Sequence, residues 1–197
     1  MDFKTIQKNF EAHGFETMFF STGAEVVEYL SGKLDKRSIG FGGSVTLREI
    51  GLYEALSKNN VVVWHHQILS NEIKQLCSHT RIYITSANAV TMSGEIVNID
   101  ADGNRIAMTV YGPERAYYVI GRNKITPNLE AALHRARNVA TPKNAKRLNR
   151  NLPCGVNGDK CYNCNSPECI CAITVILDRA PNRLPSEIIF VDEDLGY

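Results

Sequence analysis

The sequence contains no apolar run of about 18 residues, the length that a helix needs to cross a membrane. Its first segment, Met1 to Lys8, is polar and amphipathic and lacks the apolar core of a signal peptide. We therefore predict a cytoplasmic protein that makes no contact with the membrane. In a reducing compartment, clustered cysteines are more often metal ligands or catalytic thiols than disulfides.

Acidic residues are absent between positions 131 and 158, where six basic side chains occur. These are Arg135, Arg137, Lys143, Lys146, Arg147 and Arg150. A solvated basic helix face explains this pattern, and so does a site for a phosphate, a carboxylate or a nucleic acid backbone. Because no aromatic residue interleaves with these charges, the segment lacks a stacking platform and nucleic acid is disfavoured as a partner.

Strand and helix patterns alternate through the first half of the chain, after an opening helix around Ile6 and Phe10. Strands are predicted at 15–21, 37–41, 61–64 and 81–85, the third of them buried, and helices at 22–34, 44–58 and 72–78. Such alternation is typical of a parallel sheet with helices on both faces. With 44% apolar residues, the chain can bury a substantial core. The sequence therefore predicts an α/β fold.

The second half changes character. Strands are predicted at 95–99, 105–111, 115–121, 172–177 and 187–191, with helices at 127–139 and 142–148. Residues 101–104 contain Asp-Gly, which tolerates positive φ, so they are predicted to form a hairpin connection. No internal repeat or low-complexity linker occurs. We therefore predict one α/β domain over residues 1–197, with a mostly parallel sheet, a β-hairpin extension and a cysteine-rich loop at 153–171.

A glycine turn, residues 40–46, follows a predicted strand and opens a predicted helix. Backbone N–H groups at such a helix start attract anions, and glycines let an anion approach closely. We therefore predict that Gly42, Gly43 and Ser44 bind an anionic ligand. The turn is neither a Walker A loop nor a dinucleotide fingerprint, and an ordinary capped turn remains the alternative.

Other polar residues lie where the carboxyl ends of strands are expected, which is where open α/β sheets bind ligands. Amide and guanidinium groups orient carboxylates and phosphates, so Asn88, Asn98, Asn104 and Arg105 are predicted ligand-binding residues. His65 and His66 follow the 61–64 strand. Adjacent strand residues point to opposite faces, so at most one of them would face a pocket, and we expect either to be structural or on the surface.

Five of the six cysteines lie between positions 154 and 171. Cys161 and Cys164 have the two-residue spacer of a metal-chelating knuckle, and Cys154 and Cys171 lie seven residues before and after them. Four thiolates hold either zinc or an iron–sulfur cluster. The predicted ligands are Cys154, Cys161, Cys164 and Cys171. In the alternative set, the rival ligand Cys169 takes the place of Cys154. The alternatives to a metal site are inert thiols or a disulfide. The spacing of the cysteines does not distinguish a zinc site from an iron–sulfur site.

Several segments together resemble the LUD-domain (lactate-utilisation) family. They are residues 39–51, 85–90, 94–105, 121–125, 138–140, 145–148 and 192–197. The resemblance implies a fold similar to that of sugar-phosphate isomerases and coenzyme A transferases, in which the glycine turn lines the ligand site. Related sequences share cysteines matching Cys154, Cys161, Cys164 and Cys171, with Cys169 as an extra.

The family takes its name from operons for growth on lactate, which also encode iron–sulfur and oxidoreductase partners. The resemblance therefore implies a protein of lactate or related organic-acid utilisation that binds a small anionic metabolite and an iron–sulfur cluster or, alternatively, zinc. A non-catalytic accessory or regulatory module that docks a redox protein is a second reading. A sugar-phosphate isomerase or coenzyme A transferase is a third, and a homo-oligomer is compatible with all of them. No glutamate or lysine is marked by its context as a nucleophile, so the sequence leaves enzymatic activity open.

Overall fold

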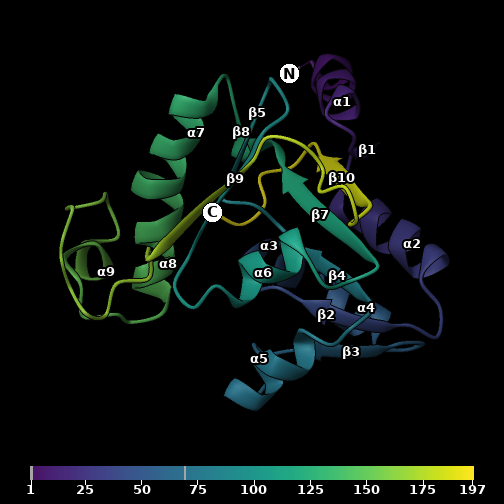
Figure 1. Cartoon of the computed structure of the whole chain (residues 1–197), viewed down its shortest axis with the longest axis horizontal. Helices are drawn as coiled ribbons and strands as arrows, with labels where there is room; N and C mark the ends of the chain where they lie inside the picture. Colours follow the sequence, from purple (N-terminus) through teal and green to yellow (C-terminus); the bar gives the residue numbers. More distant parts are fainter. Residues whose placement is uncertain (1, 69) are drawn as a thin grey trace.

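The main sheet consists of six parallel strands in the order β1-β10-β7-β4-β2-β3 (Figure 1). The computed structural model describes residues 2–68 and 70–197. The strands are β1 (Glu16–Phe20), β2 (Ser38–Phe41), β3 (Val61–Trp64), β4 (Ile82–Thr85), β7 (Arg115–Gly121) and β10 (Ser186–Val191). The predicted α/β fold with a mostly parallel sheet is confirmed.

A second, smaller sheet packs beside the first, in the order β8-β5-β6-β9. Its strands are β5 (Ala89–Thr91), β6 (Ile96–Asp100), β8 (Ile125–Thr126) and β9 (Ile173–Leu177). Strands β5 and β6 are antiparallel neighbours and form the hairpin of the fold. The hairpin predicted at 101–104 was therefore placed wrongly, because the chain turns back before β6 and not after it.

Helices cover both faces of the main sheet, as predicted. They are α1 (Phe3–Ala12), α2 (Gly23–Lys33), α3 (Val45–Glu49), α4 (Leu52–Leu56), α5 (Asn71–Cys77), α6 (Asn104–Val110), α7 (Leu129–Arg135), α8 (Thr141–Arg147) and α9 (Pro153–Asn157). Helices α2, α3 and α4 pack on one face, while α1, α5, α6 and the small sheet pack on the other. Helix α7 covers the outer face of the small sheet. No helix in the described ranges is long and apolar enough to span a membrane.

The strand predicted at 105–111 is wrong, since these residues form helix α6. The carboxylate of Asp100, at the end of β6, accepts hydrogen bonds from the backbone N–H groups of Arg105 (3.1 Å) and Ile106 (3.2 Å). It thereby satisfies donors that have no partner within the first turn of a helix. Ile106, Met108 and Thr109 are then buried. A side chain five residues upstream therefore decides the conformation of this segment.

The single helix predicted at 44–58 is two helices, α3 and α4, which meet at Gly51. Gly51 has φ 69°, which interrupts the helical hydrogen-bond ladder at little cost for glycine. Strand β3 was predicted to be buried, but it is an edge strand of the sheet, and among the described residues β2 is its one neighbour. Val61 is consequently 69% exposed.

The two helices predicted at 127–139 and 142–148 form one continuous rod, with α7 and α8 joined by a π-helical turn at Ala136–Ala140. Pro142 lacks an N–H group, and its ring crowds the preceding turn. A locally widened turn lets the helix continue past such a residue. The rod ends beside the cysteine-rich loop, so that α7, α8 and α9 lie together (Figure 1).

Candidate functional site

A cavity of about 420 Å³ lies at the carboxyl ends of the main strands. Its wall is built by residues that directly follow four neighbouring strands, β2, β3, β4 and β7, together with one side of α8. These residues are Gly43 and Ser44, His65 and His66, Ser86 to Asn88, Lys124, and Thr141, Asn144 and Arg147. Parallel α/β sheets bind their ligands at this edge. The cavity is therefore the candidate ligand site.

Most of the predicted ligand-binding residues meet at this cavity. Gly43, Ser44, Asn88, Asn104 and Arg105 line it, although they come from three separate segments of the chain. Gly42 and Asn98 do not line it and lie behind its wall.

Gly42 holds β2 against its neighbours. Its N–H donates to the carbonyl of Ile84 (2.9 Å), and its carbonyl accepts from the indole Nε1 of Trp64 (3.1 Å). A Cβ atom at this position would lie 2.5 Å from Oγ1 of Thr85 and 2.7 Å from the hydroxyl of Tyr83. No larger residue fits here without displacing β4.

Gly42→Ala is expected to lower the free energy of unfolding by about 1–3 kcal/mol, because the added methyl overpacks the contact with β4. Gly43→Ala is the matched control, since its Cβ would point into the cavity, with its nearest neighbour, Nε2 of His66, at 3.3 Å. We expect a change within about 0.5 kcal/mol for that variant. Urea denaturation of both variants tests this, and equal losses would contradict it.

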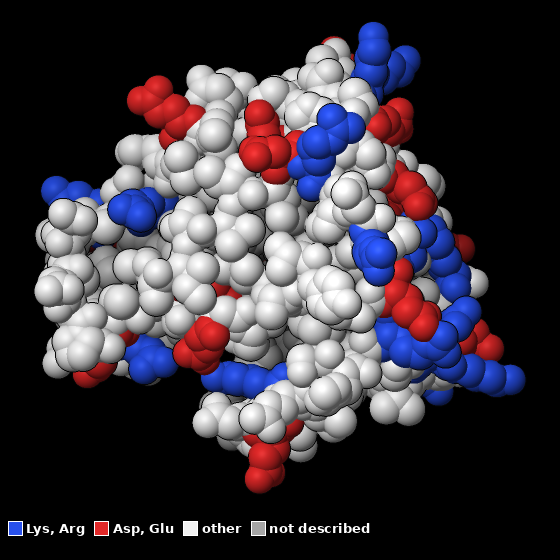
Figure 2. Space-filling model, viewed as in Figure 1, with Lys and Arg blue, Asp and Glu red and all other residues white. Residues whose placement is uncertain are grey.

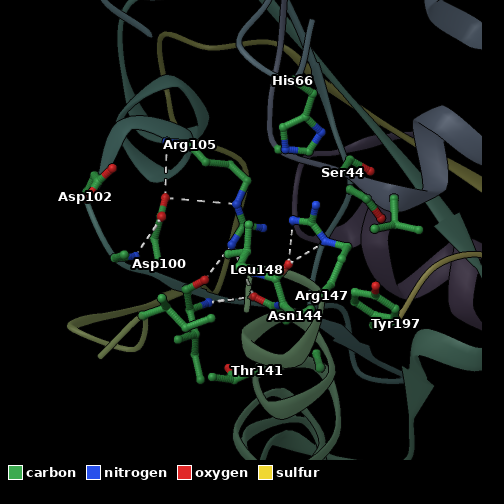
Figure 3. A pocket seen from close by; sticks show the side chains of 18 of the residues that line it. Ser44, His66, Asp100, Asp102, Arg105, Thr141, Asn144, Arg147, Leu148 and Tyr197 are labelled. Carbon is green, nitrogen blue, oxygen red and sulfur yellow. Dashed lines mark hydrogen bonds and ion pairs between the residues drawn. The ribbon is translucent and has the colours of Figure 1, made fainter. Parts of the chain in front are cut away.

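Arg105 lies at the cavity wall, with the carboxylate of Asp100 nearby (Figure 3), and the hydrogen bonds of its guanidinium go to neutral oxygens. Its Nη1 donates to Oδ1 of Asn98 (2.9 Å), and its Nη2 donates to the carbonyl of Ile99 and to Oδ1 of Asn88 (3.4 Å). The nearest carboxylate oxygen, of Asp100, lies 4.0 Å from its Nε. Asn98 therefore positions the guanidinium from behind the wall, and the positive charge of Arg105 is only partly offset.

Lys124 is a site residue that the sequence reasoning missed. Its side chain is 3% exposed, and its Nζ donates to Oγ1 of Thr46 and to Oγ of Ser86, both at 2.8 Å. Burial lowers the pKa of Lys124 to about 7, with further lowering by Arg135 and Arg105. Its position three residues after the predicted strand 115–121, at the carboxyl end, was the signal that could have found it.

Both histidines line the cavity, contrary to the expectation that at most one would face a pocket. They follow β3 in a turn, so the alternation of a strand does not apply to them. Their rings are 4.7 Å apart. Burial lowers the pKa of His66 to about 3, helped by His65, and burial also lowers the pKa of His65. Both rings are therefore neutral at pH 7, each with one donor and one acceptor.

Cations outnumber carboxylates around the cavity. The basic residues are Arg48, Lys74, Arg105, Lys124, Arg147 and Arg150, and the acidic ones are Asp100 and Asp102. Lys74 and Asp102 form an ion pair (2.6 Å), so these two charges cancel. Within the described ranges, no carboxylate lies within 4.0 Å of the basic groups of Arg48, Arg147 or Arg150.

Arg147 is the cation that reaches into the cavity from α8 (Figure 3). Its Nε and Nη2 both donate to the neutral Oδ1 of Asn144, at 3.1 and 2.8 Å. Burial lowers the pKa of Arg147, and Tyr197 acts in the opposite direction. Of the six basic residues in the 131–158 segment, Arg147 and Arg150 line the cavity and the other four do not. On the face seen in Figure 2, by contrast, basic and acidic side chains mix along one edge.

A second cavity, of about 180 Å³, is lined by all five clustered cysteines. The N–H of Asn163, between Cys161 and Cys164, donates to Sγ of Cys161 (3.3 Å). Burial raises the pKa of Cys154, and the nearby thiols of Cys164 and Cys161 add to the rise. Thr141 and Ile170 line both cavities, so the two are neighbours.

The thiol groups do not form a ready-made metal centre. Among the described residues, no three histidine, cysteine, aspartate or glutamate side chains are grouped closely enough to hold a metal ion. The donor set is nevertheless suited to zinc or to an iron–sulfur cluster, since thiolates are the usual ligands of both. Both predicted ligand sets face the same cavity, with Cys154 and Cys169 as the members that differ.

The chain belongs to the LUD domain family, whose model matches residues 3–191. Its structure is similar to a crystal structure of a DUF162 family protein from Deinococcus radiodurans, with a TM-score of 0.54 and 14% sequence identity. That alignment covers 95% of this chain and 94% of the other. At this identity the similarity supports the fold alone. No curated protein is significantly similar to the sequence.

Proposed function

We propose that this protein binds a small organic anion in the 420 Å³ cavity and takes part in the utilisation of lactate or a related organic acid. One observation supports this most: the cavity at the carboxyl ends of the strands is lined by more basic than acidic side chains, and among the described residues no carboxylate lies within 4.0 Å of the basic groups of Arg147 and Lys124. Such charges attract anions strongly when they are partly removed from water. The lactate connection comes from the name of the LUD family.

The cationic side chains are arranged by depth. Arg48 and Arg150 are exposed at the rim, Arg105 and Arg147 are half-buried, and Lys124 is buried at the inner wall. We propose that Arg147 pairs with a carboxylate, because its guanidinium now contacts only a neutral amide.

Ser44 is placed to contact the rest of the ligand. Its Oγ accepts the N–H of Leu47 (3.3 Å) as the cap of α3, which leaves its hydroxyl hydrogen free to donate. His66 is neutral and lies beside Ser44 on the same side of the cavity (Figure 3). Asn88 and Asn104 add amide groups to the wall. A 2-hydroxy or 2-oxo acid matches this mixture of charged and neutral partners.

We further propose that the cysteine-rich loop holds an iron–sulfur cluster or, alternatively, zinc. All five clustered cysteines line the cavity of about 180 Å³, and thiolates are the usual ligands of both groups. Because the two cavities are neighbours, a redox partner docked at the loop would also lie close to the anion.

Isothermal titration of the protein with L-lactate, pyruvate and inorganic phosphate tests anion binding. We expect Arg147→Gln to weaken binding by about tenfold to a hundredfold, the usual effect of losing a hydrogen bond to a charged group. Arg81→Gln is the control, because Arg81 lies just before β4, at the amino ends of the strands and so away from the cavity, and pairs with Glu114. That variant should bind as the unaltered protein does.

Two results would contradict the proposal. If none of the three anions gives a heat of binding, the proposed anion site is rejected. Equal weakening by Arg147→Gln and Arg81→Gln would show that the anion interacts with overall charge and not with this cavity.

A further inference from the structure

We infer that Lys124 is a nucleophilic amine that condenses with the carbonyl group of a small anionic carbonyl compound bound in the cavity. The compound carries a carboxylate or a phosphate next to its carbonyl group, as 2-oxo acids and phosphorylated ketoses do. This inference rests on the proposed anion site, since the neighbouring cations would hold the anionic group.

The position of the amine supports this role. Lys124 lies at the end of the short helix Arg122–Lys124 that follows β7, and its Nζ is fixed by hydroxyls from two other elements. Thr46 comes from α3 and Ser86 follows β4. Lys124 and Ser86 both line the cavity. The amine is thus held at one place on the wall of a space large enough for a small metabolite.

The surroundings of Lys124 differ from those of the lysines that form ion pairs. Lys33 and Lys74 are each paired with a carboxylate at 2.6 Å. No carboxylate of the described residues lies within 4.0 Å of Nζ of Lys124. The charged groups that affect it are Arg135, Arg105 and, in the opposite direction, Glu49. With its pKa at about 7, the amine is substantially unprotonated at neutral pH, as a nucleophile must be.

The chemistry balances without a further reactant. The Nζ lone pair attacks the carbonyl carbon, and the C=O electron pair moves to oxygen, which takes up a proton to give a carbinolamine. Loss of that oxygen as water, with the nitrogen proton, leaves an imine. Ser86 accepts a hydrogen bond from Nζ, and its own hydroxyl hydrogen is free to donate to the carbonyl oxygen. No oxidation or reduction occurs.

Trapping with sodium borohydride tests the inference, because it reduces an imine to a stable secondary amine. The protein is treated with borohydride in the presence of pyruvate, dihydroxyacetone phosphate or L-lactate, which lacks the carbonyl group. Intact mass and peptide mapping then locate the adduct. We expect a saturable adduct on Lys124 with pyruvate or with the phosphorylated ketone, and none with lactate. Which of the two reacts identifies the anionic group.

Lys124→Arg keeps a long hydrogen-bond-donating side chain but cannot form the imine, so it should reduce the trapped adduct at least about tenfold. Lys58→Arg, at an exposed lysine, is the control and should leave the adduct unchanged. Peptide mapping of the unaltered protein gives the same answer if Lys124→Arg fails to fold.

Adducts absent from Lys124, or spread evenly over surface lysines, would overturn the inference. If calorimetry shows that lactate and pyruvate bind but no adduct forms, only the imine is rejected. If neither binding nor an adduct is found, the anion site is rejected with it.

Discussion

The free energy of unfolding should contain a contribution from Lys124 that rises with pH between about pH 7 and pH 10.5. A Lys124→Met variant should lack this contribution. The pKa of Lys124 is about 7 in the folded protein and 10.5 in its ordinary state. In this window the unfolded chain binds a proton that the folded protein does not, so stability increases with pH. The slope from this residue approaches about 1.4 kcal/mol per pH unit.

The direction of this effect follows from burial. Below about pH 7 the folded protein must hold a buried ammonium group beside Arg135 and Arg105, and the full destabilisation is present. Above pH 10.5 both states are neutral and the penalty is gone. Over the whole window the difference is on the order of 5 kcal/mol. His66 has a shift of similar size, but its effect on stability falls at lower pH, between about pH 3 and pH 6.5.

Urea denaturation at pH 6, 7, 8 and 9 measures this difference. Lys124→Met also leaves the hydroxyls of Thr46 and Ser86 without their donor, which shifts its curve by a constant amount. Only the change of the difference with pH is therefore diagnostic. Lys58→Met, at an exposed position, is the control and should run parallel to the unaltered protein. A parallel curve for Lys124→Met as well would show that this lysine keeps its ordinary pKa.

Complete loss of bound metal is expected when Cys161 and Cys164 are both replaced by serine. Both residues belong to either predicted ligand set, and serine hydroxyls do not replace thiolates as ligands of zinc or iron–sulfur clusters. Structural zinc sites contribute on the order of 10 kcal/mol of binding free energy, so losing two ligands removes the metal at micromolar concentrations. Iron, zinc and sulfide are measured in protein purified without oxygen.

Two single variants decide between the ligand sets. If Cys154 completes the set, Cys154→Ser loses the metal and Cys169→Ser keeps it, and the reverse holds for the rival set. Cys77→Ala is the control, because Cys77 is buried in another hydrophobic cluster, with its Sγ 3.6 Å from the carbonyl of Phe41. It should retain all the metal. If the unaltered protein contains neither iron nor zinc, the metal-site prediction is wrong and the loop carries free thiols.

The parallel sheet was predictable because its strands are short, apolar and bounded by turns. Strands β2, β4, β7 and β10 lie close to their predicted bounds. The helix at 104–110 was not predictable in the same way, since its residues also suit a strand and the deciding contact comes from Asp100. The edge position of β3 depends on strand order, which local pattern does not contain.

The candidate site, like the fold, was predictable from the sequence only in part. The glycine turn and the polar residues after the strands were predicted, because ligands of α/β sheets bind at carboxyl ends of strands and those ends can be recognised in sequence. The role of Lys124 was missed, since a lysine after a strand is ordinary until its burial is known. Likewise, the sequence does not distinguish Gly42 from Gly43. Only the close approach of Thr85 shows that Gly42 has a packing role, whereas Gly43 lines the cavity.

Sequence alone determined the fold class, the position of the glycine turn and the clustering of five cysteines, because periodicity and spacing are local properties. Tertiary structure alone decided that one cavity is lined by residues that follow β2, β3, β4 and β7 together with Arg147 of α8, and that the cysteines face a second cavity beside it. The charge state of Lys124 was decided in the same way. The physical reason is that burial and proximity set electrostatics, and both arise only when distant segments pack together.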